Sequence, residues 1–277
     1  MCIPHYAVLG HPVTHSLSPR IHAAFGRQCG IAVTYLALDT AEQGLAATLA
    51  RFVQAGGLGA NVTVPDKAEA ALLCQSLSHR ARRAGVANTL SFRDGHWQGD
   101  NTDGSGLVRD LRDRRGLDLH GRRVLLLGAG GAAHGVAPAL LEAGIEQLVI
   151  ANRTRTRAYD LLDRLQEPDR TRACTLREVA AMGDFDLIVQ ATSAGHEGIL
   201  PTLPDLVPGP DTVCIDLNYG RAALAFIAWA HQHGCQQAFD GLGMLVEQAA
   251  DAFEIWHGVR PDTAPVYAQL RMSAGRA

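Results

Sequence analysis

A continuous apolar segment that runs directly into a glycine-rich turn is the feature that most constrains this chain. The segment Arg123–Leu127 leads into the turn Gly128–Ala132. An uninterrupted apolar run is typical of a strand buried on both faces, as in a parallel sheet covered by helices. Further apolar runs at 148–150, 187–189 and 213–215 alternate with stretches of helical pattern. The pattern predicts a doubly wound α/β domain.

The length of the chain predicts two lobes. It has 277 residues, which is more than one hydrophobic core usually organises. We place a first lobe at residues 1–104, completed by C-terminal helices at 244–277, and a second lobe at 105–243. The last helical segment supports this layout, because it carries an apolar face formed by Leu245, Ala249, Ala252, Phe253 and Trp256. We expect that face to pack back on the first lobe.

Composition narrows the partners of the chain to small molecules. Hydrophobic residues make up 47%, charged residues 19%, and the formal net charge is -3, which favours neither nucleic acid nor an anionic membrane. No run approaches the ~18 apolar residues of a membrane span, and the start does not resemble a signal peptide. We therefore expect a soluble, cytoplasmic chain with no nucleic-acid or membrane partner. The oligomeric state is left open, with a homodimer as the candidate assembly.

Cysteine and histidine spacing predicts no metal site. The six cysteines never stand at C-x-x-C spacing, which argues against a zinc knuckle, a redox pair or a disulfide scaffold. The pairs His11/His15 and His231/His233 have no carboxylate or thiol at ligand spacing beside them. Reduced, mostly buried thiols are the expectation.

One lysine stands out among the basic residues. Of the 25 basic side chains, 24 are arginine and one is Lys67. An ammonium group can lose its proton when it is desolvated, whereas a guanidinium stays charged. The surviving lysine therefore marks a position that needs a titratable base. The alternative is that one lysine persists by chance, and the count alone does not decide between the two.

The segment before Lys67 predicts a strand with one polar face. A period of two places Val62 and Val64 on one face, and Asn61 and Thr63 on the other. A proline then stops the strand. Lys67 is expected in the turn that follows or in the first turn of the next helix.

A hairpin is predicted to bring further polar groups together. Asp94-Gly95 between apolar runs is a strong signal for a two-residue hairpin turn. Pairing about this turn places Asn88 opposite Asn101 and therefore near Asp103. The alternative is that this Asx-rich segment only caps the following helix.

The glycine-rich turn predicts a dinucleotide site. Gly128–Ala132 follows a buried strand and opens a helix, where backbone N–H groups receive a pyrophosphate; the alternative is a turn without a ligand. NAD enzymes usually carry an acid about 20 residues further on. Here the next strand ends in Asn152–Arg157, which contains Arg153, Arg155 and Arg157. Guanidinium groups bind a 2′-phosphate, so NADP is predicted. A solvated basic helix start is the alternative, and helix electrostatics disfavour it.

The motifs also occur in a characteristic order along nearly the whole chain. They are Ser16-Leu17-Ser18-Pro19, Asn61-Val62-Thr63-Val64-Pro65 with Lys67, Ala87-Asn88-Thr89, Asp100-Asn101-Thr102-Asp103-Gly104, Gly128–Ala132, Asn152-Arg153-Thr154, Ala191-Thr192-Ser193-Ala194-Gly195 and Asp240-Gly241-Leu242-Gly243-Met244. Together they resemble the shikimate dehydrogenase family. The resemblance implies an NADP-dependent oxidoreductase that reversibly reduces 3-dehydroshikimate to shikimate, on the route to chorismate and aromatic amino acids. It implies an α/β substrate-binding catalytic lobe and a doubly wound, Rossmann-type NADP-binding lobe.

The resemblance also implies roles for individual residues. Lys67 would be the catalytic acid/base, with Asp103 holding the substrate hydroxyl and orienting Lys67; how the two share the proton is left open. Ser16 and Ser18 would bind the substrate carboxylate. The ring hydroxyls would be lined by Asn61, Thr63, Asn88, Asp103, Tyr219 and Gln248. The cofactor would be bound by Gly128, Ala129, Gly130, Gly131, Ala132, Asn152, Arg153, Thr154, Arg157, Thr192, Leu217 and Gly241.

Several members of this set have simpler alternatives. Ser18 followed by proline also predicts a helix N-cap, Tyr219 a loop aromatic and Gln248 a solvated helix position. The chain departs from the family pattern at Asp66, which replaces the usual aromatic, and at His79 and His134. The segment after Tyr219 also lacks the usual Thr-Pro. These departures bear on cofactor affinity and nicotinamide-side geometry more than on the reaction class.

Three rival functions follow from the same residues. A quinate/shikimate dehydrogenase with broader substrate or cofactor use is the nearest, although a preference for NAD would want an acid near position 153. A folate-linked methylene dehydrogenase would carry Tyr-x-x-x-Lys, whereas Thr63 stands four positions before Lys67. A non-catalytic NADP-binding homologue is disfavoured by the presence of both Lys67 and Asp103.

Overall fold

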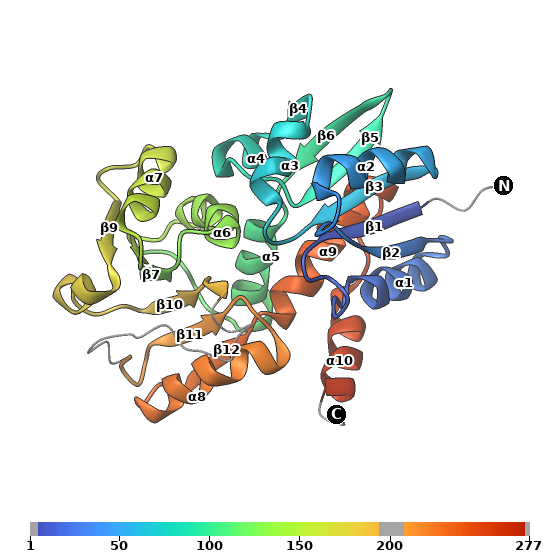
Figure 1. The fold of residues 1–277 in the computed structure, drawn as a ribbon. Helices are drawn as coiled ribbons and strands as arrows, with labels where there is room; N and C mark the ends of the chain where they lie inside the picture. Colours follow the sequence, from blue (N-terminus) through green and yellow to red (C-terminus); the bar gives the residue numbers. More distant parts are fainter. Residues whose placement is uncertain (1–4, 194–207, 275–277) are drawn as a thin grey trace. The chain divides into compact units, whose positions relative to one another are not determined.

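The computed structural model describes residues 5–193 and 208–274. The chain forms two compact units, one made of Met1–Gly106 with Val246–Ala277 and the other of Leu107–Leu245. Each unit contains a 6-stranded sheet, and Figure 1 colours both along the chain. The predicted α/β class with two lobes is therefore confirmed.

The first unit is built on a mixed sheet in the order β2-β1-β3-β5-β6-β4. Its strands are β1 (His5–Gly10), β2 (Thr34–Asp39), β3 (Gly57–Val62), β4 (Ser76–Leu77), β5 (Thr89–Arg93) and β6 (His96–Asp100). The strands β1, β2 and β3 are parallel, whereas β5 pairs antiparallel with β3 and β6. The helices that begin in this unit are α1 (Ser18–Cys29), α2 (Gly44–Gln54), α3 (Lys67–Leu73), α4 (His79–Ala84), α5 (Asp103–Arg109) and α10 (Thr263–Ala274).

The predicted hairpin is present in the predicted register. Thr89 pairs with Asp100 in the β5–β6 ladder. The turn residues Asp94 and Gly95 have φ values of 52° and 79°. Two successive residues in the left-handed region are what a type I′ hairpin turn requires, and glycine adopts that conformation without a steric penalty. The local sequence therefore sets which residues β5 and β6 bring together.

Two local predictions in the first unit are wrong in detail. Leu17, not Ser18, stands at the N-cap of α1, and Leu17 itself makes no side-chain capping hydrogen bond. Ser18 is instead inside the first turn, where its N–H donates to Ser16 Oγ at 3.2 Å. The strand β3 ends at Val62, so Thr63 lies beyond it, although the Thr63 N–H still donates to the Leu9 carbonyl at 2.8 Å.

The C-terminal helix α9 (Leu242–His257) packs on the first unit, as its apolar face predicts. The ring of Trp256 stacks on Tyr6 with centroids 4.7 Å apart, and its Nε1 donates to the Leu90 carbonyl at 3.0 Å. Phe253 meets Phe25 of α1 edge-on at 5.8 Å. Chain segments far apart in sequence therefore complete one core.

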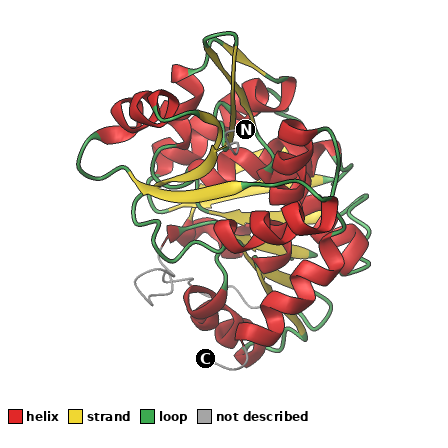
Figure 2. Ribbon diagram, turned by 90° about the vertical axis from the view of Figure 1, so that its right-hand side faces the viewer, coloured by secondary structure: helices red, strands yellow, loops and turns green. Residues whose placement is uncertain are grey.

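The second unit is built on a parallel sheet in the order β12-β11-β10-β7-β8-β9. Its strands are β7 (Arg123–Leu127), β8 (Gln147–Asn152), β9 (Thr171–Thr175), β10 (Leu187–Gln190), β11 (Val213–Asp216) and β12 (Gln237–Asp240). Its α-helices include α6 (Gly131–Glu142), α7 (Arg155–Leu165) and α8 (Leu224–Gln232). Figure 2 draws strands in yellow and helices in red. No helix of residues 5–193 or 208–274 is both long and apolar enough to cross a membrane.

The central strand β7 is buried on both faces, as its unbroken apolar run predicts. Val124 and Leu126 belong to one hydrophobic cluster, whereas Leu125 and Leu127 belong to another. The chain adds β8 and β9 on one side of β7, and then β10, β11 and β12 on the other. Ligands of doubly wound sheets bind where the strand order reverses in this way. The carboxyl ends of β7 and β10 are therefore the expected binding edge.

The packing of α9 on β3 predicts a steric requirement at Gly59. A Cβ atom there would lie 2.6 Å from Trp256 Nε1, and the stacked, hydrogen-bonded indole has little freedom to move. Gly59→Ala should lower the free energy of unfolding by about 1–3 kcal/mol in urea titrations. Gly209→Ala is the control, because its Cβ would make an ordinary 3.6 Å contact with Thr212 Oγ1. Equal stability of the two variants would contradict this packing.

Candidate active site

A buried ion pair joins the start of α3 to the start of α5. Lys67 Nζ lies 2.6 Å from Asp103 Oδ2, and the two side chains are 9% and 6% exposed. Lys67 occupies the first position of α3, as predicted, because the chain turns immediately after β3. Burying two charges costs several kcal/mol per ion unless other hydrogen bonds compensate. The surroundings of this pair therefore matter for both stability and chemistry.

Asn88, the residue before β5, supplies hydrogen bonds that compensate for the burial of this pair. Its Nδ2 lies 3.0 Å from Asp103 Oδ1, 2.9 Å from Thr102 Oγ1 and 3.1 Å from Gln248 Oε1. Its Oδ1 accepts from the Thr102 backbone N–H at 2.8 Å. Because a backbone N–H can only donate, this contact sets the orientation of the Asn88 amide. Asn88 therefore links the ion pair to Gln248 on α9.

Asn61 has a similarly defined orientation. Its Nδ2 donates to the Asn88 carbonyl and to Thr89 Oγ1, both at 3.1 Å, while its Oδ1 accepts from Tyr35 Oη at 2.7 Å. Burial raises the pKa of Tyr35 well above its usual value, although the neighbouring Ser18 hydroxyl acts in the opposite direction. Tyr35 is therefore a neutral donor. Tyr35 could not be identified from sequence, because its contact with Asn61 crosses from β2 to β3 over β1.

The other predicted substrate residues of this unit differ in their burial and in their contacts. Ser18 and Gln248 are 4% and 7% exposed, so the solvated-helix alternative for Gln248 is wrong. Ser16 is half-buried and accepts from the Ser18 N–H. Among the described residues, neither the Ser16 nor the Thr63 hydroxyl forms a hydrogen bond with Lys67, Asp103 or Asn88. The structure thus brings together Lys67, Asp103, Asn88, Asn61 and Gln248 in one hydrogen-bonded network.

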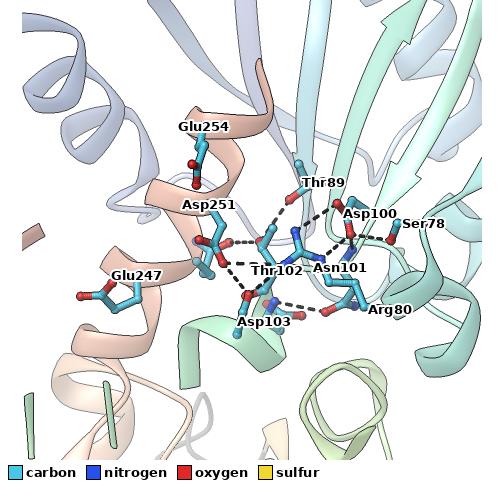
Figure 3. Close-up of polar contacts among 12 residues, drawn as sticks. Ser78, Arg80, Thr89, Asp100, Asn101, Thr102, Asp103, Glu247, Asp251 and Glu254 are labelled. Atoms are coloured by element: carbon cyan, nitrogen blue, oxygen red, sulfur yellow. Dashed lines mark hydrogen bonds and ion pairs between the residues drawn. The ribbon is translucent and has the colours of Figure 1, made fainter. Parts of the chain in front are cut away.

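The segment from Asp100 to Asp103 combines capping with placement of the acid. Asn101 Oδ1 accepts from the Asp103 N–H at 3.1 Å, and Ser105 Oγ lies 3.1 Å from the Thr102 carbonyl oxygen. Figure 3 shows these residues gathered beside Thr89. Capping alone is not their whole role, because the Asp103 carboxylate itself contacts Lys67 and Asn88.

In the second unit, the glycine-rich turn leaves its backbone accessible at the start of α6. A Cβ on Gly128, whose φ is 107°, would lie 3.0 Å from Thr192 Cγ2, so a larger residue is disfavoured by backbone and space. A Cβ on Gly130, the N-cap of α6, would meet no described atom within 4 Å. Free N–H groups beside open space at a helix N-terminus suit a pyrophosphate. The turn therefore fits the phosphates of a dinucleotide.

The arginines after β8 have different surroundings. Arg155 donates to Tyr159 Oη at 3.1 Å and lies 3.5 Å from Glu178. Arg153 and Arg157 are exposed and form no ion pair with any described residue. Asn152 Nδ2 donates to the Thr154 carbonyl at 2.9 Å, which shapes the turn that carries Arg153. Arg153 and Arg157 are therefore the guanidinium groups that a 2′-phosphate could engage.

The turns after β10, β11 and β12 hold the other predicted cofactor residues. Thr192 Oγ1 is buried and has no hydrogen-bond partner among the described residues, so this hydroxyl fits a contact with a polar ligand. A Cβ on Gly241 would lie 2.4 Å from the Leu217 carbonyl oxygen, so glycine is required there. Tyr219 is half-buried and also belongs to this unit. Ala194 and Gly195 of the predicted motif lie outside the described residues.

Two acids at this edge were not singled out by sequence. Asp216 and Asp240 are register partners at the ends of β11 and β12. Burial raises the pKa of Asp216 to about 7, hydrogen bonds from Asn218 oppose the shift, and the Asp240 charge adds to it. In the sequence, an acidic residue at the end of an apolar strand was the signal that could have identified these two acids. Within the described ranges, no group of three or more His, Cys, Asp or Glu side chains is placed to hold a metal ion.

Comparisons with known families match most of the chain. Residues 8–90 match the family described as shikimate dehydrogenase substrate binding domain, 110–202 match shikimate / quinate 5-dehydrogenase, and 241–271 match shikimate 5'-dehydrogenase C-terminal domain. The chain belongs to the shikimate dehydrogenase family. The predicted family is therefore confirmed.

Individual relatives cover nearly the whole chain. A shikimate dehydrogenase (NADP(+)) of Xanthomonas euvesicatoria pv. vesicatoria (strain 85-10) is 58% identical over 98% of this chain and 96% of its own length. One from Xylella fastidiosa (strain 9a5c) is 56% identical over 99% and 98%. The Thermus thermophilus shikimate 5-dehydrogenase, solved with NADP(H) and shikimate, has a TM-score of 0.83 at 35% identity, covering 97% of this chain and 99% of its own.

The buried acid at the end of β11 predicts a pH dependence of stability. Asp216 has a folded pKa of about 7, above the ~3.9 of an unfolded chain. Because folded Asp216 holds its proton more tightly than the unfolded chain does, protonation adds to the free energy of unfolding. This contribution is fully present below about pH 4 and is lost as the pH rises through about 7. Asp216→Asn should gain on the order of 1–4 kcal/mol relative to the unchanged protein between those pH values. Urea unfolding across the range measures this, and a pH-independent difference would contradict the assignment.

Proposed function

We propose that this chain is an NADP-dependent shikimate dehydrogenase, which interconverts shikimate and 3-dehydroshikimate. The observation that carries the proposal is the buried Lys67–Asp103 pair inside a network of oriented amides. This network lies in a member of a family whose relatives are named shikimate dehydrogenase (NADP(+)). It offers a proton donor and acceptor beside several hydrogen-bonding groups, which is what a polyhydroxy acid requires.

In the proposed reaction, Lys67 handles the proton. Bound NADP would supply the acceptor for the hydride that leaves C3 of shikimate. In this direction the neutral amine of Lys67 takes the proton of the C3 hydroxyl and becomes an ammonium paired with Asp103; in the reductive direction the ammonium returns that proton to the carbonyl oxygen. Asp103 orients both Lys67 and the hydroxyl, since one of its oxygens already contacts Nζ and the other contacts Asn88. A positioned acid/base group of this kind typically contributes 10²–10⁴-fold.

Substrate recognition is assigned to polar groups, two of which are amides with a defined orientation. Ser16 and Ser18 would receive the carboxylate near the N-terminal end of α1, and Asn61, Thr63, Asn88, Asp103, Gln248 and Tyr219 would contact the ring hydroxyls. The amide of Asn88 is held by the Thr102 N–H, and that of Asn61 by Tyr35. Amides held in this way recognise a hydroxyl without first having to be ordered.

Cofactor binding is assigned to the second unit. Gly128–Ala132 would hold the pyrophosphate at the start of α6, with Asn152, Arg153, Thr154 and Arg157 around the 2′-phosphate. Thr192, Leu217 and Gly241 would contact the nicotinamide side. The first unit, residues 1–104 with 244–277 in the predicted boundaries, then acts as the catalytic domain, and residues 105–243 as the NADP-binding domain.

The chemistry of the thiols supports a cytoplasmic location for the proposed enzyme. Cys29, Cys74, Cys174, Cys214 and Cys235 are all free. Cys214 and Cys235 are buried neighbours whose contact contributes to a raised pKa of Cys214, after burial itself. Cysteines that form no disulfide are typical of proteins in a reducing compartment, and we therefore propose the cytoplasm.

Replacing the proposed base tests the reaction directly. Lys67→Arg keeps the positive charge and removes titration, so kcat with shikimate should fall by ~10²-fold or more while NADPH still binds. NADPH formation at 340 nm measures turnover, and fluorescence titration measures cofactor binding. Near-normal turnover of the variant would exclude Lys67 as the base.

The same assay separates the rival functions. Rates with shikimate and quinate, each with NADP and NAD, should be highest for shikimate with NADP. Comparable rates with quinate or NAD would favour a quinate/shikimate dehydrogenase with broader use. Absence of any shikimate-dependent NADPH formation would favour a non-catalytic NADP-binding homologue.

Removing one guanidinium from the proposed 2′-phosphate site should alter cofactor choice. Arg153→Gln should raise the KM for NADP by about 10-fold, since one charge-assisted contact is worth roughly 1.4 kcal/mol or more. The KM for NAD, which lacks the phosphate, should stay within about twofold of its starting value. Arg164→Gln, an exposed arginine in the last turn of α7, is the matched control. An equal effect on both cofactors would exclude Arg153 from phosphate recognition.

A further inference from the structure

Arg80 of α4 contacts the chain on both sides of Asp103. Its Nε and Nη2 donate to the two carboxylate oxygens of Asp100 at 2.6 and 3.0 Å. Its Nη1 donates to Ser105 Oγ at 3.2 Å. Asp100 precedes Asp103 and Ser105 follows it, so one guanidinium spans the beginning of α5. Figure 3 labels Arg80 beside Asp100. A bidentate arginine–carboxylate contact is both strong and geometrically specific.

Asp100, one of the residues that Arg80 contacts, is held in place by further hydrogen bonds. Ser78 Oγ donates to Asp100 Oδ1 at 2.6 Å, and the Asn101 N–H donates to the same oxygen at 2.7 Å. Burial disfavours the charged form of Asp100, but the hydrogen bond from Arg80 outweighs it with the help of Ser78, and the pKa of Asp100 is lowered. Asp100 therefore stays ionised and paired with Arg80.

The Ser105 end is held from α9. Ser105 Oγ donates to Asp251 Oδ2 at 2.5 Å, and Asp251 is 4% exposed. Arg260 bonds both Asp251 and Glu247, the latter at 2.7 Å. Gln248 lies between those two acids on α9, so the same contacts steady the helix turn that carries it. The start of α5 is thus braced by α4 on one side and α9 on the other.

We propose that Arg80 is a positioning residue for the reaction, which holds Asp103 in register with Lys67 by anchoring Asp100 and Ser105. Arg80 touches neither Lys67 nor Asp103 in the contacts described above, so it acts through the backbone between its two anchors. The Lys67–Asp103 contact of 2.6 Å leaves little tolerance for a shift of α5. Displacements of ~1 Å at a reacting group can cost up to ~10²-fold in rate. The inference rests on the proposed function.

The test replaces Arg80 with methionine, which keeps the aliphatic stem. We expect kcat with shikimate and NADP to fall about 10-fold, with both KM values within about twofold, because an interaction that acts only in the transition state lowers kcat and kcat/KM together. Arg170→Met is the matched control. The Arg80 and Arg170 side chains are 37% and 36% exposed, and Arg170 pairs with Glu167 in the other unit. The control should stay within about twofold of normal turnover.

A double-mutant cycle separates positioning from a general loss of structure. With Asp103→Asn already in place, Arg80→Met should change the residual kcat less than about twofold, because the residue through which it acts has been disabled. An undiminished 10-fold loss in that background, or a kcat within about twofold of normal for Arg80→Met alone, would overturn the proposal. Thermal unfolding establishes that each variant is folded.

Arg80→Lys keeps the inference testable if the methionine variant does not fold. Lysine retains the charge but cannot bind Asp100 bidentately, so about a 3-fold loss of kcat is expected. In the Asp103→Asn background the same substitution should leave kcat unchanged. Unchanged turnover in a folded Arg80→Lys variant would contradict the proposed role of the Arg80 contacts with Asp100 and Ser105. If the unsubstituted protein does not oxidise shikimate at all, the proposed function fails first, and that outcome is distinct from any result with the variants.

Discussion

The ion pair between Lys67 and Asp103 is the interaction on which the rest of the first unit depends. Two nearly buried charges 2.6 Å apart persist only when the remaining lone pairs and protons find partners. Asn88 provides one of these, and Thr102 and Gln248 hold Asn88 in turn. An apolar replacement would satisfy packing more simply, so the pair is better explained by chemistry than by stability.

Support for this pair is arranged in successive layers. Amides contact the charges, Tyr35 and the Thr102 backbone orient those amides, and Arg80 braces the segment that carries Asp103. These residues lie on β2, β3, α4 and the segments that precede β5 and α5, all in the first unit. The second unit follows a separate logic, in which glycine turns, exposed arginines and strand ends leave polar groups available to a ligand.

Local sequence predicted those contacts that depend on chain geometry close to the residue itself. The Asp94-Gly95 turn determines the pairing of β5 with β6, and this places Asn88 near Asp103. The register is predictable because a two-residue turn permits only one pairing. Errors arose at element ends: Ser18 lies inside α1 and not at its cap, and Thr63 lies beyond β3. Cap and strand-end positions depend on small backbone differences that sequence patterns resolve poorly.

Sequence patterns were enough to predict the two-lobed α/β class, the glycine turn after a buried strand, the hairpin register and the single lysine suited to titration. Those features follow from periodicity, turn stereochemistry and the chemistry of one side chain. The folded structure was needed to find that Tyr35 meets Asn61, that Arg80 spans Asp100 and Ser105, and that burial raises the pKa of Asp216. These contacts join elements that are not adjacent in the chain, and burial is a property of the packed fold.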